Sequence, residues 1–430
     1  MAHSSRHQVE EALARIADPA GEGERSCLSV YADAARAAAD AADERAKSGQ
    51  PLGPFDGRVV TIKDLFDVAG EVTRAGSRAL ARVSAPAAVD AEAVVRLRAA
   101  GAVIVAKTNM TELAFSGVGA NPHFGTPGNP VDRTRIPGGS TSGGAVACAD
   151  GIGDVAIGTD TGGSLRIPAA LCGLVGWKPT ARRVSKQGVH PLSPTFDSVG
   201  PIARTLADCW LADAVLSGDA CDPLAARTLD QLRIGVVQGL VLDKLDTMVA
   251  TSFEWALGQL APARCVDVTP DALRVLIAVA QRGGIVPSEA FAMHRELLDA
   301  AGTEIDPLIH ARLVGGQAVP EADYRANLSD RELGIAQMHA VFEDFDVLVL
   351  PTTPIVAPRL AEVASAEGFG SRNALLLRNT SVANFFDLCA VSLPIRCGQA
   401  LPCGFMLLGR SGGDRALFEC AAAIERALVQ

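Results

Sequence analysis

The 430 residues, of which 48% are hydrophobic, can bury a large core in about two to three average domains or in one large α/β domain. The 39 basic and 49 acidic residues give a net charge of −10, which argues against a nucleic-acid surface because phosphate binding needs clustered Lys and Arg. The N-terminus lacks an apolar signal core, and the longest uncharged stretch, 113–131, is too rich in Gly, Pro and Asn to span a membrane. We therefore expect a cytoplasmic protein with neither nucleic-acid nor membrane partners.

The predicted elements of the first half alternate between helix and strand. Residues 7–17 and 28–47 read as helices, and a β-branched strand over 58–63 ends abruptly at Lys63. A helix over 90–100 and a second buried strand over 101–106 follow. This alternation is typical of an α/β fold with a parallel or mixed sheet.

A long loop over 113–139 follows, which we expect to be functional because such loops are uncommon inside a domain. The later elements are helices at 142–149, 205–216 and 413–428, strands at 155–158, 233–237 and 346–350, a mostly helical segment at 249–347, and a final sheet region that ends at 409. No repeat or low-complexity linker divides the chain, so we predict one domain over 1–430. Its regions are N-terminal helices 1–50, a motif core 55–205, a helical substrate-shaping region 206–345 and a C-terminal sheet and helix region 346–430.

The ten cysteines form no CxxC pair and no cluster with histidine at zinc spacing. Cys148, Cys172 and Cys389 lie in apolar or small-residue runs, which predicts buried free thiols. The sequence also lacks GxSxG, GxxxxGK[ST], HExxH and GxGxxG. We therefore expect no metal and no cofactor.

The stretch from Pro137 to Thr180 holds eleven glycines and two serines, Ser140 and Ser164, that each follow a Gly-Gly pair and lie 24 residues apart. Glycine at this density marks tight turns or close backbone approaches, so the two hydroxyls are expected to face one site. Ser164 suits a nucleophile, with the backbone N–H groups of Thr161, Gly162, Gly163 and Ser164 as an oxyanion hole. From this segment alone, a capped helix after a glycine turn explains the residues equally well.

The order of three motifs resolves this ambiguity. Lys63 in VVTIKDLFDVAG, Ser140 in PGGSTSGG and Ser164 in GTDTGGSLRIPA resemble the three motif blocks of the amidase signature family. The similarity is dense over 55–205 and thin over 206–345, and it extends to KTNMTELA, CGLVGWKPT and LPCGFMLLG. The resemblance implies the family's single large domain, with a mixed central sheet covered by helices on both faces.

The resemblance also implies a Ser–cis-Ser–Lys triad in which Ser164 attacks, Ser140 relays the proton and Lys63 is the final base. Burial at a strand tip can lower the pKa of a lysine enough for it to act as a base. Lys107 and Lys178 compete for this role, but we interpret them as structural lysines that are exposed or lie in loops without a phosphate to bind. His123 is interpreted as a hydrogen-bonding loop residue.

Charged residues near Ser164 and in the C-terminal region leave substrate recognition open. Asp160 and Arg166 are expected to form an ion pair that braces the loop, although some branches of the family bind acidic substrates through an arginine near this position. Asp387 in NFFDLCAVSLP is a second open position, and this pattern resembles amidases that act on urea derivatives. Thr141 stands where the family commonly has serine, which leaves Ser140 intact.

The resulting hypothesis is an amidase that hydrolyses a small-molecule amide through an acyl-enzyme on Ser164 and releases ammonia or an amine. The alternatives are a glutaminase-type A subunit of a tRNA-dependent amidotransferase, a biuret- or allophanate-like hydrolase, and a catalytically silent binding protein on the same fold. A small amide is the expected partner, and a homodimer is left open.

Overall fold

The computed structural model describes residues 4–395, 398 and 400–428 of the chain. Residues 1–3 of the predicted N-terminal region, residues 396–397 and 399 of the predicted C-terminal sheet region, and residues 429–430 lie outside the described residues.

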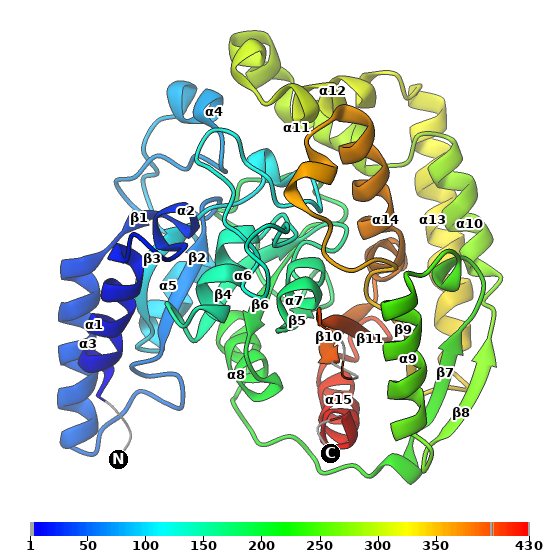
Figure 1. Cartoon of the computed structure of the whole chain (residues 1–430), viewed down its shortest axis with the longest axis horizontal. Helices are drawn as coiled ribbons and strands as arrows, with labels where there is room; N and C mark the ends of the chain where they lie inside the picture. The colour runs from blue at the N-terminus through cyan, green and yellow to red at the C-terminus, as the bar shows by residue number, and fades with distance from the viewer. Residues whose placement is uncertain (1–3, 396–397, 399, 429–430) are drawn as a thin grey trace.

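One mixed sheet of eleven strands, counted over the described residues, runs through the molecule (Figure 1). The strands are β1 (Cys27–Val30), β2 (Val59–Lys63), β3 (Val103–Thr108), β4 (Val155–Asp160), β5 (Val175–Lys178), β6 (Ser198–Ala203), β7 (Arg233–Val237), β8 (Arg264–Val268), β9 (Val347–Pro351), β10 (Cys389–Ile395) and β11 (Cys403–Gly409). Their spatial order is β1-β3-β2-β4-β6-β5-β10-β11-β9-β7-β8. Parallel pairing joins β3, β2 and β4 near one edge and β9, β7 and β8 at the other, whereas the strands between are antiparallel.

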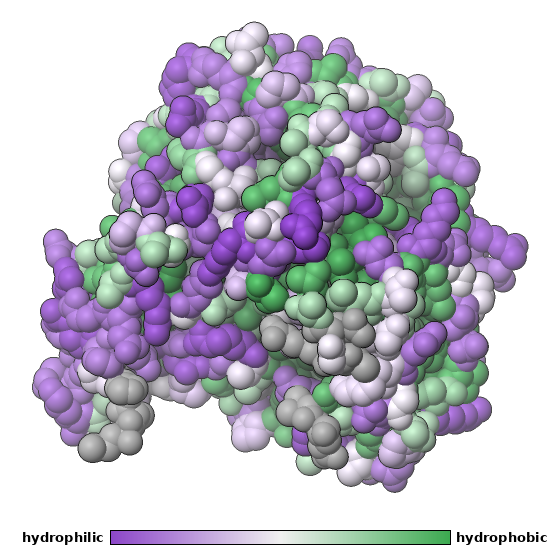
Figure 2. Space-filling model, viewed as in Figure 1, coloured by the Kyte–Doolittle hydropathy of each residue, from purple (hydrophilic) through white to green (hydrophobic). Residues whose placement is uncertain are grey.

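Helices cover this sheet along its whole length. They are α1 (Ser5–Ala17), α2 (Gly23–Ser26), α3 (Ala32–Lys47), α4 (Arg78–Val83), α5 (Glu92–Ala99), α6 (Ser142–Ala149), α7 (Arg166–Cys172), α8 (Leu206–Ser217), α9 (Thr247–Gln259), α10 (Ala272–Gln281), α11 (Val286–Ala301), α12 (Pro307–Gln317), α13 (Glu321–Val341), α14 (Ala366–Phe385) and α15 (Asp414–Leu428). The paired α1 and α3 present a mainly hydrophilic surface at the left of Figure 2. Above the sheet in Figure 1, α11 and α12 lie close to α14.

Alternating side chains of β10 and β11 show that the sheet is buried on both faces. Phe405 and Leu407 belong to the core that includes Phe418 of α15, whereas Met406 and Leu408 belong to the core that includes Phe385 of α14. Successive strand residues point to opposite faces, so the side chains of β10 and β11 pack alternately into two separate cores. The predicted single α/β domain with a mixed, doubly covered sheet is confirmed.

Three elements differ from the sequence-based prediction. The helix predicted over 28–47 begins only at Ala32, because Cys27–Val30 form β1. The mostly helical segment 249–347 also contains β8, an exposed edge strand. The final sheet region was wrong over 366–385, where α14 begins after the cap residue Ser365, whose hydroxyl accepts a hydrogen bond from the N–H of Gly368.

Candidate active site

Lys63 lies at the end of β2 and is fully buried, as the sequence predicts. Its Nζ donates to Ser140 Oγ over 2.8 Å and to Thr159 Oγ1 of β4 over 3.0 Å. Burial lowers the pKa of Lys63 to about 7, although the negative charges of Asp160 and Asp197 act in the opposite direction. A large fraction of this amine is therefore neutral near pH 7 and can accept a proton.

Ser140 is held in the loop that precedes α6. Its backbone carbonyl accepts from the N–H of Thr111 over 3.1 Å, and the N–H of Gly139 donates to Gly117 over 2.8 Å. A Cβ on Gly139 would lie 2.7 Å from the backbone nitrogen of Gly119, so only glycine allows the two segments to pack this closely. The Gly139–Ser140 peptide bond is cis.

Ser164 lies in the turn between β4 and α7, which we call the catalytic turn (residues 161–164). Gly163 has a φ of +140°, and a Cβ there would lie 2.2 Å from Thr380 Oγ1 of α14. The same Thr380 hydroxyl donates to the carbonyl of Gly162 over 2.6 Å. The N–H of Thr141 donates to the carbonyl of Ser164 over 3.3 Å, which ties the Ser140 loop to the catalytic turn.

The backbone N–H groups of this turn point away from other acceptors. Within the described part of the chain, the N–H groups of Gly162, Gly163 and Ser164 make no hydrogen bond, whereas the next one, of Leu165, donates to Asp160 Oδ2 over 3.1 Å. Free, fixed N–H donors beside a hydroxyl are what an oxyanion requires.

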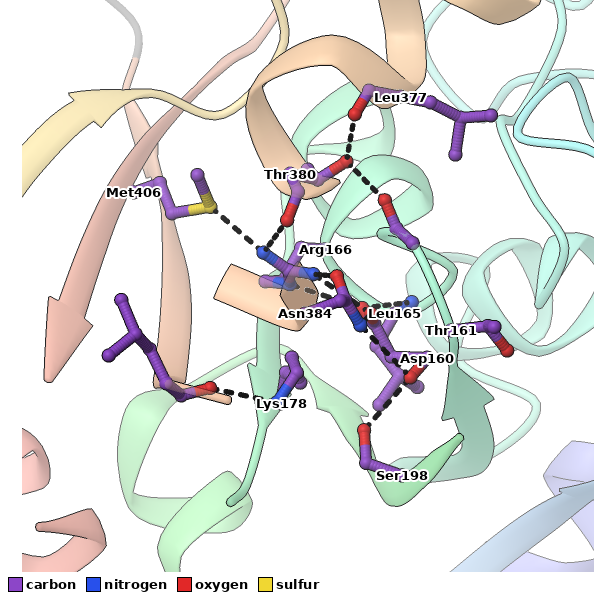
Figure 3. Close-up of polar contacts among 12 residues, drawn as sticks. Asp160, Thr161, Leu165, Arg166, Lys178, Ser198, Leu377, Thr380, Asn384 and Met406 are labelled. Atoms are coloured by element: carbon purple, nitrogen blue, oxygen red, sulfur yellow. Dashed lines mark hydrogen bonds and ion pairs between the residues drawn. The ribbon is translucent and has the colours of Figure 1, made fainter. Parts of the chain in front are cut away.

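Asp160 and Arg166 form the predicted brace behind the catalytic turn (Figure 3). Arg166 binds both carboxylate oxygens of Asp160, at 2.8 and 3.1 Å, and also donates to Asn384 Oδ1 and to the carbonyl of Thr380. The guanidinium holds the pKa of Asp160 near 2 against the effect of burial. Both side chains are fully buried and neither borders the cavity described next, so their role here is structural.

A cavity of about 140 Å³ opens in front of the catalytic turn. Thr161, Gly162 and Ser164 of the turn line it, together with Phe115, Leu192 and Pro287 among other residues. Ser164 is 4% exposed, whereas Ser140 and Lys63 are 0% exposed. A ligand in the cavity therefore meets Ser164 first, with Ser140 and Lys63 behind it.

Arg312 of α12 also lines this cavity, and sequence reasoning missed it. Its Nε donates to the carbonyl of Phe115 over 2.9 Å, and its guanidinium lies over the Phe115 ring at 4.4 Å. Burial lowers the pKa of Arg312 to about 10, and no ion pair links it to a carboxylate among the described residues. The sequence offers no signal for it, since Phe115 is distant in the chain and arginines are common on helix surfaces.

Two interpretations of lysines were wrong in detail. Lys107 and Lys178 are buried in strands β3 and β5 rather than exposed or in loops. Lys178 Nζ donates to the carbonyls of Pro179 and Leu388, both over 2.8 Å, and Lys107 Nζ lies 3.6 Å from Glu71 Oε2. Their strands, β3 and β5, each have a neighbouring strand on both sides, so neither lysine lies on an exposed sheet edge. Neither lysine borders the cavity.

The other residues considered from the sequence lie away from Ser164. His123 pairs with Glu112 at 3.0 Å, and Asp387 accepts from Ser411 Oγ over 3.1 Å without lining the cavity. Cys148, Cys172 and Cys389 are buried free thiols, as predicted. In the described residues, no cluster of His, Cys, Asp and Glu could hold a metal ion, and no helix has the length and apolarity needed to cross a membrane.

Sequence comparison finds known proteins that are similar to this chain over most of its length. The family model described as Amidase matches residues 8–418. The chain is 34% identical to 2-amino-5-chloromuconic acid deaminase of Comamonas testosteroni, covering 92% of this chain and 87% of that protein. It is 36% identical to the AtzE component of 1-carboxybiuret hydrolase from Pseudomonas sp. (strain ADP), covering 83% and 80% respectively.

Two further similarities extend over almost the whole chain. The A subunit of glutamyl-tRNA(Gln) amidotransferase from Streptomyces avermitilis is 35% identical, covering 98% of this chain and 92% of that protein. A crystal structure described only as an amidase superposes with a TM-score of 0.89 at 34% identity, covering 99% of this chain and 96% of that one.

The chain belongs to the amidase family, as the motif blocks indicate. It is a hydrolase that acts on carbon–nitrogen bonds of non-peptide amides.

Proposed function

We propose that this protein cleaves a small amide through an acyl-enzyme on Ser164, with Ser140 as proton relay and Lys63 as final base. The observation that carries the proposal is the 2.8 Å hydrogen bond between Lys63 Nζ and Ser140 Oγ, directly behind the catalytic turn. Such a chain of groups can activate a hydroxyl that is a weak nucleophile on its own.

The proton transfers balance over the two halves of the reaction. Ser164 Oγ bonds to the amide carbon while its proton passes to Ser140 Oγ, and the proton of Ser140 passes to the neutral amine of Lys63. When the C–N bond breaks, the proton returns through Ser140 to the leaving nitrogen. Water then attacks the acyl-enzyme by the same route and releases the acid and free Ser164.

The catalytic turn stabilises the negative charge that forms on the substrate oxygen. The N–H groups of Gly162, Gly163 and Ser164 are unoccupied and fixed by contacts from α14. We assign them, with the N–H of Thr161, as oxyanion donors. Such donors contribute most when they are already in place before the reaction.

The cavity favours a small substrate that carries a carboxylate. At about 140 Å³ it holds only a few non-hydrogen atoms beyond the amide group. Arg312 supplies a positive charge to this cavity, and no carboxylate among the described residues forms an ion pair with it. Guanidinium groups bind carboxylates in a matched, two-pronged geometry. Two relatives carry names of acid substrates, which supports the same class.

Matched pairs of amides test this proposal. We expect ammonia release from malonamic and succinamic acids to exceed that from propionamide and butyramide, and Ser164→Ala to abolish release from all of them. Cys148→Ala, which alters a buried thiol away from the cavity, is the control and should retain activity. Full activity of the Ser164→Ala protein would overturn the assignment of the nucleophile.

The second candidate is the A subunit of a tRNA-dependent amidotransferase, favoured by 35% identity that extends over 98% of this chain. This candidate requires glutamine as substrate and partner proteins for full activity. Release of ammonia by the purified chain alone from carboxylated amides, with none from glutamine, would exclude it. The cytoplasmic location and the homodimer stay predictions.

A further inference from the structure

Asp197 is a buried carboxylate that no step of the proposed reaction uses. It lies directly before β6 and is 6% exposed. One oxygen accepts a hydrogen bond from Thr161 Oγ1, at the start of the catalytic turn. The other accepts from the backbone N–H groups of Leu192 and Ser193, each over 3.0 Å. Three donors therefore converge on this side chain.

These bonds link the catalytic turn to a second segment that lines the cavity, at Leu192. Thr161 and Leu192 both line the cavity, and Asp197 contacts both. The connection continues through Ser193, whose hydroxyl donates to Glu289 of α11 over 2.5 Å. Glu289 also accepts from the N–H of Thr195 and from Tyr324 of α13, both over 3.1 Å. Thr161 is therefore connected to Leu192, Ser193 and Glu289 through a short series of hydrogen bonds.

We propose that Asp197 is a positioning residue of the amidase reaction. Its hydrogen bonds to Thr161 and to the N–H of Leu192 hold the catalytic turn at a fixed distance from the Leu192 segment of the cavity lining. This inference rests on the proposed role of the turn as the oxyanion hole. Asp197 touches neither the cavity nor Ser164, so it acts through Thr161. A displacement of about 1 Å in such a turn can reduce the rate about 100-fold.

The charge of Asp197 provides a second, independent readout. Asp160 and Asp197 are the two carboxylates that raise the pKa of Lys63 against burial. Burial raises the pKa of Asp197 itself, which its hydrogen bonds and Lys186 counteract. Removal of this negative charge should lower the pKa of Lys63 and move the acidic limb of the activity profile to lower pH.

The test compares Asp197→Asn with variants of its partner. An asparagine presents an N–H₂ donor and a carbonyl to three donors, so at least one contact is lost. We expect kcat to fall about 10- to 100-fold while KM changes less than about threefold. We expect Thr161→Val to reproduce the loss of kcat and Thr161→Ser, which keeps the hydroxyl, to retain activity. The kcat of the double variant Asp197→Asn/Thr161→Val should be no lower than that of either single variant.

Asp213→Asn is the matched control. Asp213 is also a buried carboxylate, accepts hydrogen bonds from Trp177 Nε1 and Arg183 Nε, and does not line the cavity. This variant should unfold at lower temperature, with kcat and the acidic limb of the pH profile unchanged.

Wild-type kcat in both Asp197→Asn and Thr161→Val, or additive losses in the double variant, would overturn the inference. If Asp197→Asn does not fold, the Thr161 variants decide. Full activity of Ser164→Ala would instead show that the proposed function is wrong.

Discussion

The catalytic turn and the part of the cavity lining that α11 and α12 supply, which we call the helical wall (Val286, Pro287 and Arg312), are built in different ways. Behind the turn, Asp160 and Arg166 satisfy each other in a network that includes Asn384 and Thr380. On the wall, Arg312 of α12 rests on Phe115 and has no carboxylate partner among the described residues. One region holds its charges in balance, and the other presents an unbalanced charge to the cavity.

We interpret the turn as the region that serves the chemical step and the helical wall as the region that selects the substrate. A fully paired network keeps a turn rigid, which suits a site that must stabilise the same transition state in every turnover. An unpaired cation in a small cavity gains most from an anionic ligand. The predictions below alter the two regions separately, beginning with the largest expected effect.

Replacement of the base should affect the reaction most. Lys63→Ala removes the group that accepts the proton from Ser140, so we expect kcat to fall by about 10²- to 10⁴-fold. The control is Lys178→Ala, because Lys178 is also buried but bonds only to the carbonyls of Pro179 and Leu388. The control should lose stability and keep its kcat. Equal losses of kcat in both variants would contradict the assignment of Lys63 as the base.

The brace should be tested by stability. Arg166→Met leaves Asp160 as an unpaired buried charge, which should reduce the free energy of unfolding by about 3–5 kcal/mol. Arg325→Met, which removes an exposed pair with Glu321, should cost less than about 1 kcal/mol. Urea unfolding of both variants measures the difference. Similar small losses would show that the buried network does not brace the turn.

The wall should be tested by specificity. Arg312→Met should raise KM for carboxylated amides about 10- to 100-fold, because a charged hydrogen bond contributes about 1.5–3 kcal/mol. Neutral amides of the same size should show little change. Arg331→Met is the control, since Arg331 also stacks on a phenylalanine, Phe196, but does not line the cavity. An equal effect on both classes of amide would assign Arg312 a packing role only.

The smallest expected effect is the pH dependence of the unmodified protein. Lys63 must be neutral to act, and its pKa is lowered to about 7, so the protonated and inactive form dominates below that pH. We expect kcat/KM to fall about tenfold per pH unit on the acidic side and to level off above it. A profile that stays flat well below pH 7 would contradict the role of Lys63 as base.

The sequence marks the turns before Ser140 and Ser164 because their backbone geometry requires glycine. Gly163, which precedes Ser164, has a positive φ, and Gly139, which precedes Ser140, lies against Gly119, so both leave a visible glycine signal. The ion pair of Asp160 and Arg166 was also predicted and is confirmed, since the two residues are close in sequence.

The rest depends on contacts between distant segments. Helix α14 has no single apolar stripe because its buried residues include Asn379, Thr380 and Asn384, so periodicity did not reveal it. Strand β8 is short and exposed, without the alternation of a half-buried strand. Arg312 and Asp197 acquire their significance only from neighbours that the fold brings to them.

Detection of the acyl-enzyme tests the central claim most directly. The protein would be mixed with an activated ester of a carboxylated acyl group, quenched with acid while deacylation limits turnover, digested and analysed by peptide mass spectrometry. We predict an acyl adduct on Ser164, and its loss in the Ser164→Ala protein. Turnover with the adduct on another residue, or an unchanged adduct in that variant, would contradict the account.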